Sequence, residues 1–269
     1  MSASEPSKNH GAIQTGGLGG LVAGFSYPLR AIAFLQQTPR LAWYVLIPIL
    51  INVIVGGTFY TWALSAGFNG IDGLMAGLPD WARFLELLLR GLLAIILLIA
   101  TGLLLLQFGG ILGSPLYGRL SEELEILRTG HKAEDVPGIG SIVRDIWRAI
   151  LFELKKLVLV IGLGLPLFFV GWFPGIGTAI ATVGSIGLGV TIVCLDFFDP
   201  ALERRRLRFR DKLGWVRRSF PASATFGLVS LGLVSIPFVN LLAIPLCITA
   251  GTLFFCDRIL PKLEPGDRN

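Results

Sequence analysis

Residues 41–64 read LAWYVLIPILINVIVGGTFYTWAL, an apolar stretch without a single charged side chain. As an α-helix, its 24 residues would be about 36 Å long, which exceeds the roughly 30 Å thickness of a hydrocarbon core. Trp43, Tyr44, Tyr60 and Trp62 lie near its two ends, where aromatic rings favour the membrane interface. The stretch therefore predicts a transmembrane helix.

A second apolar stretch, Phe84–Phe108, predicts a second transmembrane helix. Glu86 and Arg90 stand four residues apart in its first turns, a spacing that favours an ion pair on one helix face near the interface. The alternative is that Arg90 lines a polar pathway across the membrane. Between the two helices, Gly67–Asp80 is rich in glycine and aspartate and predicts a loop.

The composition of the chain supports a membrane protein. Hydrophobic residues make up 53% of the 269 residues and charged residues 15%, whereas soluble domains carry about 25% charged residues. The net charge of +5 does not indicate nucleic-acid binding, because the basic residues occur in short runs between apolar stretches. Such runs usually face the cytoplasm and anionic lipid.

Two further pairs of apolar stretches predict helical hairpins. The first, residues 157–198, turns at Pro174-Gly175, and the second, residues 222–255, turns at Pro237. The first arm of the second pair has only 15 residues, which is short for a full span, so this hairpin either re-enters or crosses the membrane. The sequence thus predicts an all-α integral membrane protein with two long transmembrane helices and two hairpins, six membrane-embedded segments in all.

Amphipathic and basic segments connect these stretches. Residues 116–156 carry apolar side chains at helical spacing and predict amphipathic cytoplasmic helices, the last of which continues past Lys155 and Lys156 into the membrane. Residues 203–218 follow the first hairpin as a basic loop. The predicted organisation is one membrane domain between a disordered N-terminal tail and a short C-terminal tail: residues 21–260, 1–20 and 261–269.

Lysine and arginine are distributed unevenly between the two sides of the predicted membrane. The loop 65–83 carries one, Arg83, whereas 119–156 carries seven and 204–218 carries eight. This bias predicts a multi-pass protein of the plasma (inner) membrane with both termini in the cytoplasm. We also expect the basic loop to bind anionic lipid head groups, through Arg204, Arg205, Arg206, Arg208 and Arg210.

No catalytic or metal-binding pattern is present in the sequence. Cys194, Cys247 and Cys256 lie in or beside apolar stretches, and His10 and His131 lie in polar ones, without the spacing of metal ligands or of a disulfide framework. There is no phosphate-binding loop and no nucleophile motif. We therefore expect neither a metal nor another cofactor, and no enzyme.

Three stretches of the sequence carry a resemblance to a known family. They begin at Gly24-Phe25 and reach Pro39-Arg40-Leu41, run from Ser114-Pro115-Leu116 to Glu125, and extend from Phe173-Pro174-Gly175-Ile176-Gly177 to Cys256-Asp257-Arg258. In order and spacing they resemble the CysZ-type sulfate permeases, within the wider superfamily of etoposide-induced-protein-like membrane proteins. The resemblance covers roughly residues 20–260.

The resemblance implies sulfate uptake across the inner membrane by a homo-oligomer, with helical hairpins that partly penetrate the bilayer. It also implies that sulfate is held at the start of the first long helix, by backbone amides and a pair of arginines. This sequence departs from that pattern, because Ala42 and Trp43 occupy the positions of the arginine pair and Arg40 replaces a glycine.

Helix chemistry still favours an anion site at that position. Thr38 can cap a helix, Pro39 suits its first residue, and the free amides of the next residues would point outward at the positive end of the helix dipole. The candidate site consists of Thr38, Pro39, Arg40, Leu41 and Ala42, with Arg30 contributing from the preceding segment. Alternatively, Arg30 and Arg40 only anchor the helix at lipid phosphates.

Two functional hypotheses follow. The first is a membrane permease for sulfate or a related oxyanion that supports sulfate assimilation. The second is a non-transporting membrane scaffold that organises lipid or partner proteins, favoured by the missing arginine pair and by the long cytoplasmic helices of residues 116–156.

Overall fold

The computed structural model of the protein is helical throughout the residues it describes, which are 18–76, 79, 83–130, 139–236 and 238–263; the side chains of 106–112, 114–115 and 139–146 are not part of that description. The helices are α1 Leu18–Gln37, α2 Pro39–Met75, α3 Arg83–Thr129, α4 Ile139–Gly171, α5 Ile176–Arg204, α6 Phe209–Arg218, α7 Ala222–Val234, α8 Val239–Phe254, the π-helical turn η2 Phe255–Ile259 and α9 Leu260–Leu263.

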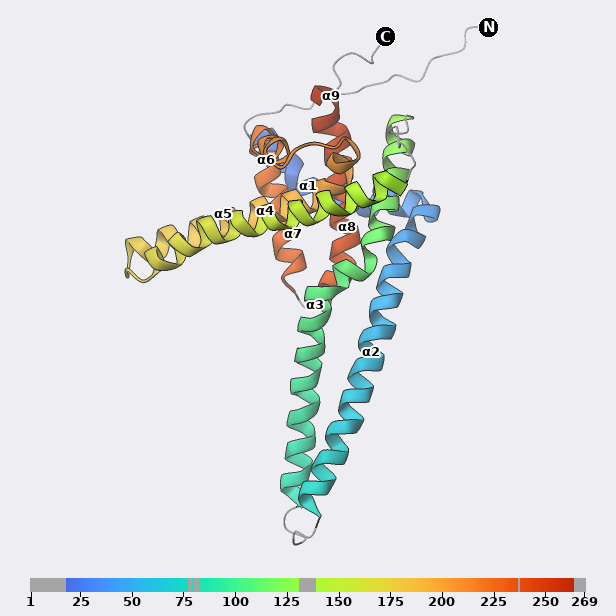
Figure 1. Ribbon diagram of the computed structural model, residues 1–269, viewed down its shortest axis with the longest axis vertical. Helices are drawn as coiled ribbons and strands as arrows, with labels where there is room; N and C mark the ends of the chain where they lie inside the picture. The colour runs from blue at the N-terminus through green and yellow to red at the C-terminus, as the bar shows by residue number, and fades with distance from the viewer. Residues whose placement is uncertain (1–17, 77–78, 80–82, 131–138, 237, 264–269) are drawn as a thin grey trace.

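Helices α2 and α3 form a long antiparallel hairpin that defines the long axis of the molecule (Figure 1). The predicted loop over Gly67–Asp80 is wrong in its first part, because α2 continues to Met75. Gly67 lies against the side chain of Leu93, where a Cβ atom would collide with it. The glycine therefore brings α3 close to α2, and this packing keeps the backbone helical where the composition indicated a turn.

Helix α3 also continues where the sequence indicated an end. Residues 109–117 contain three glycines and a proline, which favour a break in a helix, yet α3 is helical from Arg83 to Thr129, over 47 residues. Instead of ending, the helix changes direction between its two halves (Figure 1). Its first half pairs with α2, and its last turns pack against α8, so one helix connects the membrane hairpin to the C-terminal bundle.

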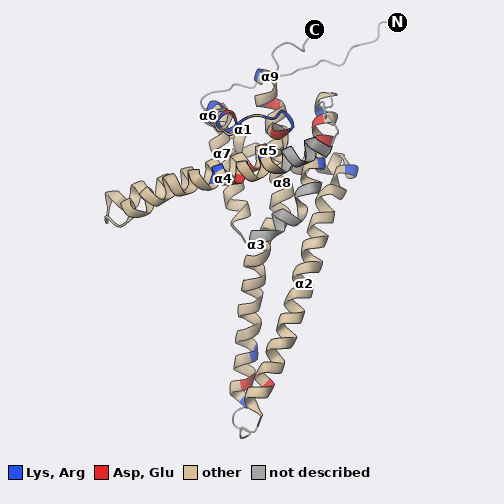
Figure 2. Ribbon diagram, viewed as in Figure 1, with Lys and Arg blue, Asp and Glu red and all other residues tan. Residues whose placement is uncertain are grey.

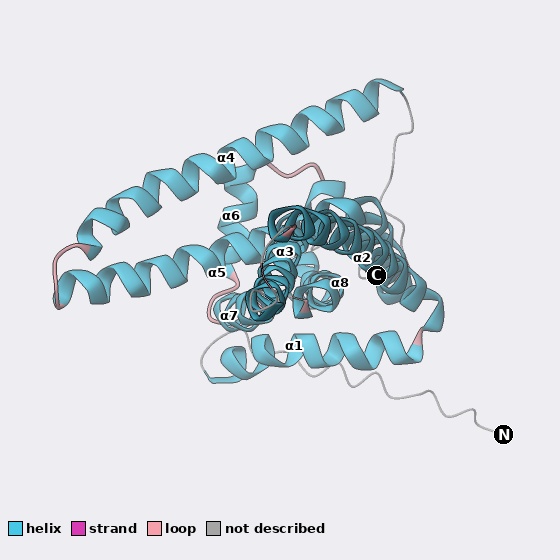
Figure 3. Ribbon diagram, turned by 90° about the horizontal axis from the view of Figure 1, so that it is seen from below, coloured by secondary structure: helices cyan, strands magenta, loops and turns pink. Residues whose placement is uncertain are grey.

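Helices α4 and α5 form the predicted hairpin, with a turn at Gly175, whose φ of 83° suits glycine. The helix predicted to pass Lys155 and Lys156 does so, since α4 runs from Ile139 to Gly171. The hairpin extends sideways, across the direction of α2 and α3 (Figures 1 and 3). Its long apolar side chains are largely exposed, as expected of a surface that contacts lipid rather than water.

Six helical segments are long and apolar enough to cross a membrane, but they are not quite the six predicted. They are 18–37, 39–75, 83–105, 147–171, 176–204 and 239–263. Helix α1 is an addition: it begins at Leu18, inside the predicted N-terminal tail, of which residues 1–17 lie outside the described residues. Helix α7 has only 13 residues and does not qualify, in keeping with the short arm noted in the sequence.

The core lies where α1, α5, α7 and α8 meet. Tyr27, Phe198, Phe226 and Phe254 are fully buried there, and their rings contact one another. The ring of Phe254 is 4.9 Å from both Tyr27 and Phe198, centroid to centroid, and Phe198 stacks on Phe226 at 5.2 Å. Such aromatic contacts stabilise a core beyond the burial of area alone. They attach the α1 helix to the two C-terminal hairpins.

Charged residues gather at two places among the described residues. Most surround α6, the end of α5, the end of α3 and the π-helical turn, and a smaller group lies at the far end of the α2–α3 hairpin (Figure 2). The stretches of α2 and α3 between these two places carry no charged side chains, in keeping with the high cost of placing charge in lipid. The basic segment predicted as a loop, residues 203–218, contains the helix α6.

Helix α1 depends on the absence of a side chain at Gly24. A Cβ atom there would overlap the carbonyl oxygen of Ala222 and the hydroxyl of Thr225 in α7. Gly24→Ala should therefore separate the two helices and lower the free energy of unfolding by about 1–3 kcal/mol, which thermal unfolding in detergent would measure. Gly57→Ala is the matched control, because nothing lies within 4 Å of that position. Equal melting temperatures for the two variants would contradict the packing described.

Candidate functional site

The start of α2 is less available to an anion than its sequence indicated. Thr38 does not cap the helix with its side chain; its hydroxyl donates to the carbonyl of Phe34, 2.6 Å away. The amide of Leu41 donates to the carbonyl of Thr38 at 2.9 Å. Only Thr38 separates α1 from α2, so the negative carbonyl end of one helix dipole meets the positive amide end of the next.

The side chains predicted to surround that helix start point in different directions. Arg40 and Pro39 are exposed, and Leu41 is buried. Arg30 lies on α1, where its guanidinium stacks on Tyr27 and reaches Asp257 at 3.9 Å. Its ion-pair partner therefore belongs to the C-terminal part of the chain, so the structure brings Arg30 to a different charged cluster from the one expected.

At the far end of the α2–α3 hairpin, Arg90 is held by acidic side chains. Its Nη2 contacts Glu86 Oε1 at 2.6 Å, the i,i+4 pair that the sequence indicated, and also Asp72 on α2. The guanidinium lies 5.4 Å from the ring centroid of Phe68. This ion-pair cluster links the two helices near their connection.

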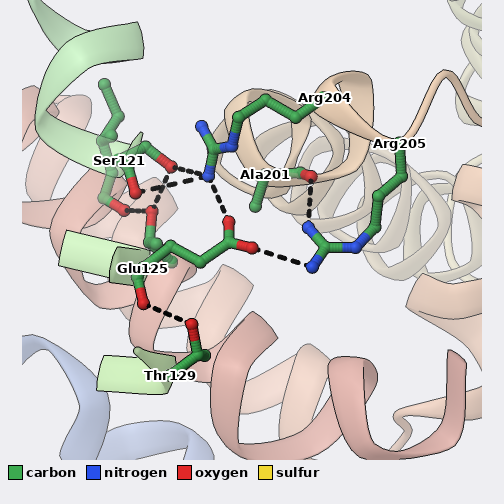
Figure 4. A network of polar contacts seen from close by, with 8 residues as sticks. Ser121, Glu125, Thr129, Ala201, Arg204 and Arg205 are labelled. Atoms are coloured by element: carbon green, nitrogen blue, oxygen red, sulfur yellow. Dashed lines mark hydrogen bonds and ion pairs between the residues drawn. The ribbon is translucent and has the colours of Figure 1, made fainter. Parts of the chain in front are cut away.

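A buried carboxylate binds two arginines between α3 and α5 (Figure 4). Glu125 is 3% exposed; Arg204 Nη2 donates to its Oε2 at 2.5 Å and Arg205 Nη2 to its Oε1 at 2.8 Å. Arg205 also lies 4.6 Å from the ring centroid of Phe255. Charge-assisted bonds of this kind are among the strongest in proteins, and here two cations share a single anion.

Hydroxyl groups extend this polar network into the bundle. Arg204 Nη2 donates to the hydroxyl of Ser121 at 3.0 Å, and the hydroxyl of Thr252, on α8, donates to the same Ser121 oxygen at 2.8 Å. Both hydroxyl side chains are fully buried. The Nε of Arg204 is buried without a hydrogen-bond partner among the described residues.

A second cluster of the same kind lies one turn further along α3. Asp257 Oδ1 accepts from Arg128 Nη2 at 3.1 Å, and Asp257 also faces Arg30 and Tyr27. These residues border an open groove of about 210 Å³, lined by Arg30, Ala33, Phe34, Gln37, Arg128, Leu253 and Asp257.

The π-helical turn Phe255–Ile259 lies between the two clusters and contributes a fifth arginine. Arg258 is 5% exposed, and its Nε and Nη2 have no hydrogen-bond partner among the described residues. Arg30 and Arg128, both about half exposed, pair with Asp257, and the less exposed Arg204 and Arg205 pair with Glu125.

The aspartates at the ends of the apolar arms pair with basic side chains other than Arg204 and Arg205. Asp196 binds Lys156 at 2.7 Å, Asp199 binds the buried Lys212, and Asp257 binds Arg128. The first two pairs attach α4 and α6 to α5. They leave Arg204 and Arg205 to Glu125.

The predicted lipid-binding arginines divide into two groups. Arg204 and Arg205 are largely buried, with side chains 15% and 14% exposed, so their assignment to lipid head groups was wrong. The reason is that α5 continues to Arg204 and carries both residues against α3. Arg206, Arg208 and Arg210 are exposed and keep that assignment as a prediction.

Comparison with known proteins gives a consistent result. A family model described as "Sulfate transporter CysZ/Etoposide-induced protein 2.4" matches residues 27–245. The chain is similar to a protein of Pectobacterium atrosepticum named sulfate transporter CysZ, with 27% identity over 86% of each chain. It is likewise 28% identical to a protein of that name from Pseudomonas aeruginosa, over 82% of this chain and 89% of the other. These names describe transporters rather than enzymes, as expected from the sequence.

Glu125 should be essential to the stability of the bundle. Glu125→Ala would leave two buried cations unpaired and should cost about 3–5 kcal/mol in the free energy of unfolding, measured as thermal unfolding in detergent. Glu123→Ala, two residues away and exposed, is the control and should change stability by less than about 0.5 kcal/mol. Equal losses in the two variants would show that the network does not stabilise the fold.

Proposed function

Because this chain belongs to the family of sulfate transporter CysZ and etoposide-induced protein 2.4, we propose that it carries sulfate or a related oxyanion across the plasma (inner) membrane, in support of sulfate assimilation. The relatives named sulfate transporter cover most of the chain. The long apolar helices make it a multi-pass membrane protein. An anion carrier needs a place where positive charge is available inside the protein.

The single observation that supports this function best is the presence of buried guanidinium nitrogens without a hydrogen-bond partner. Arg258, which is 5% exposed, and Arg204 both carry such nitrogens among the described residues. A buried cation without a counter-ion costs several kcal/mol. An oxyanion would supply the missing charge, and guanidinium groups are suited to it because their planar forks donate two parallel hydrogen bonds.

In this proposal Glu125 is the resident counter-ion that sulfate replaces. An incoming dianion accepts from the guanidiniums of Arg204 and Arg205, and the carboxylate of Glu125 is displaced from them. The hydroxyls of Ser121 and Thr252 donate to the oxygens that face them. When Glu125 binds its arginines again, the anion leaves. Binding is thus kept weak enough for release, which transport requires.

The start of α2 remains a candidate entrance. Arg40 is exposed at the positive end of a long helix, and Arg30 stands in the groove beside Arg128. We propose that residues Thr38–Ala42 and Arg30 attract the anion from solution. The alternative, that these arginines contact lipid phosphates, predicts no effect on transport.

The α7–α8 hairpin is proposed to re-enter the membrane rather than cross it. Helix α7, with 13 residues, is about 20 Å long against a hydrocarbon core of roughly 30 Å. At its tip, Phe238 packs on Gly102 of α3, with its Cζ 3.0 Å from where a Cβ would stand. Gly102 lies about 18 Å along the helix from Arg90, whose ion-pair cluster would mark the outer interface. The tip would then lie inside the hydrocarbon layer.

Orientation and lipid contact are proposed from the charge distribution. The exposed arginines of the α5–α6 connection lie at the same end of the molecule as α9 (Figure 2), and basic residues prefer the cytoplasmic side. Both termini would then be cytoplasmic, with Arg206, Arg208 and Arg210 against anionic head groups. The homo-oligomer that the resemblance implies stays a prediction.

The rival hypothesis is a membrane scaffold without transport. It is favoured by Ala42 and Trp43, which stand in place of the arginine pair of the family. The unsatisfied buried nitrogens of Arg204 and Arg258 speak for the carrier, because a scaffold has no need of unsatisfied guanidinium nitrogens inside its bundle. Measured flux separates the two.

Proteoliposomes containing the protein should accumulate radiolabelled sulfate faster than empty vesicles. Arg204→Gln and Arg205→Gln should lower the rate by about 10- to 100-fold, the effect of losing one charged hydrogen-bonding partner. Arg40→Ala should instead raise the sulfate concentration needed for half-maximal rate. The exposed Arg217→Gln is the control and should transport normally. Flux equal to that of empty vesicles at several pH values would reject the carrier and leave the scaffold.

Replacing Arg206, Arg208 and Arg210 together with glutamine should weaken anionic lipid binding by about 3 kcal/mol, at about 1 kcal/mol per arginine. Mass spectrometry of the lipids retained in detergent would measure this. The same variant should lose part of its uniform orientation, which protease access to a C-terminal tag in intact cells would report. The triple lysine variant keeps the charge and should resemble the unmodified protein; if it behaves like the glutamine variant, the proposal fails.

A further inference from the structure

An asparagine at the tip of the α7–α8 hairpin has no hydrogen-bond partner for its side chain among the described residues. Asn240 is the second residue of α8 and is 1% exposed. Neither its Nδ2 nor its Oδ1 finds a partner there. A buried amide without hydrogen bonds costs a few kcal/mol, and in lipid no bulk water relieves that cost. The group that satisfies it lies outside the described residues.

Asn240 lies at a helix start, and an unsatisfied hydroxyl lies on α3, the helix that Phe238 of the same hairpin tip contacts. Phe238 precedes α8 with a φ of 66° and provides no side-chain cap. On α3, Thr101 stands next to Gly102, the residue that Phe238 contacts; it is 4% exposed, and its Oγ1 has no partner in the described part of the chain. Polar groups from two helices are therefore left unsatisfied near one hairpin tip.

The geometry of an α-helix directs the Asn240 side chain to the helix start. Cα–Cβ bonds tilt toward the N-terminus, so an asparagine in the first turn reaches back toward the free amides and the positive end of the dipole. The amides of Asn240 and Leu241 donate to the carbonyls of Ile236 and Phe238. Among the described residues, neither the amide of Val239 nor the Nδ2 of Asn240 has an acceptor, so both remain as donors at this end of a 16-residue helix.

We propose that the tip of the α7–α8 hairpin is an intramembrane site for a partly hydrated oxyanion, bound by the Asn240 amide and the start of α8. This inference rests on the proposed function and adds a second anion-binding site to the transport pathway. The anion accepts from Nδ2 and the free amide, and a water of its hydration shell donates to Oδ1. Half-helices that end inside the membrane serve anionic groups in this way in other transporters.

The chemistry of the site favours an anion over a cation. The helix start repels cations through its partial positive charge. An uncharged amide also suits a site of brief occupancy, because it binds a dianion more weakly than the arginines near Glu125 do. Thr252, whose hydroxyl contacts Ser121 of that network, and Asn240 lie on the same helix, about 18 Å apart for twelve residues.

Labelling of Asn240→Cys in reconstituted vesicles tests the site. We would use two methanethiosulfonate reagents, one bearing a sulfonate and the other a quaternary ammonium. The sulfonate reagent should modify the variant at least about ten times faster than the ammonium reagent, given the sign of the helix-start charge, and sulfate should slow the reaction. The unmodified protein, whose Cys194, Cys247 and Cys256 are buried, gives the background rate. No modification above that background, or a faster reaction with the cationic reagent, would overturn the site.

Transport by Asn240→Leu provides an independent measurement. Leucine fills the space without a polar group, so the variant should fold as well as the unmodified protein, measured by thermal unfolding, while sulfate flux falls by about ten-fold or more. Asn69→Leu, at an exposed position of α2, is the matched control and should transport normally. If the unmodified protein and Asn240→Leu carry sulfate equally, the tip site is wrong and the proposed function stands. If the unmodified protein carries none, the proposed function itself fails, and this site with it.

Discussion

The contact between Glu125 and the guanidiniums of Arg204 and Arg205 connects the parts of this protein that would otherwise be independent. Glu125 belongs to the helix that forms the long membrane hairpin, and the two arginines end the laterally extended hairpin of α4 and α5. Ser121 adds a hydrogen bond to α8. Because a buried charge must keep a counter-ion, neither hairpin can shift relative to the other unless something else takes the place of the carboxylate. Structural attachment and anion binding therefore depend on the same three residues.

The sequence could predict the elements whose signal is local. Uninterrupted apolar stretches gave both helices of the long hairpin, and Pro174-Gly175 gave the turn between α4 and α5. The continuity of α2 could not be predicted, because Gly67 indicates a turn in the sequence. Only the structure shows that Leu93 of the neighbouring helix α3 packs against this glycine. Helix α1 was missed for a related reason: Tyr27, Pro28 and Arg30 interrupt its apolar pattern. Tyr27 and Arg30 are accommodated by partners from the C-terminal part of the chain.

The candidate site was harder to predict than the fold. Glu125 and Arg204 are 79 positions apart in the sequence, and nothing in a charge pattern indicates which acidic residue will meet which basic one. The run Arg204–Arg210 indicated a lipid-facing loop. Its members Arg206, Arg208 and Arg210 are exposed. Arg204 and Arg205 instead contact Glu125 of α3, because α5 continues as far as Arg204. The anion site expected at the start of α2 rested on a free helix end, but α1 follows so closely that part of this end is already bonded. The local sequence pattern of a helix start was therefore present, but the short connection to α1 leaves fewer free amides for an anion than the pattern predicted.

The π-helical turn Phe255–Ile259 has a consequence for the evolution of the chain. A wide turn of this kind is usually the mark of one extra residue inside an α-helix, and such insertions persist mostly at functional positions. The extra residue lets Phe255 stack on Arg205 while Asp257 faces Arg128. In a homologue that lacks the insertion, the following residues would be rotated by about 100° around the helix axis, so the phenylalanine and the aspartate could not both keep their arginines. We therefore expect the length of this one helix to separate relatives that share both charge clusters from relatives that share only the fold.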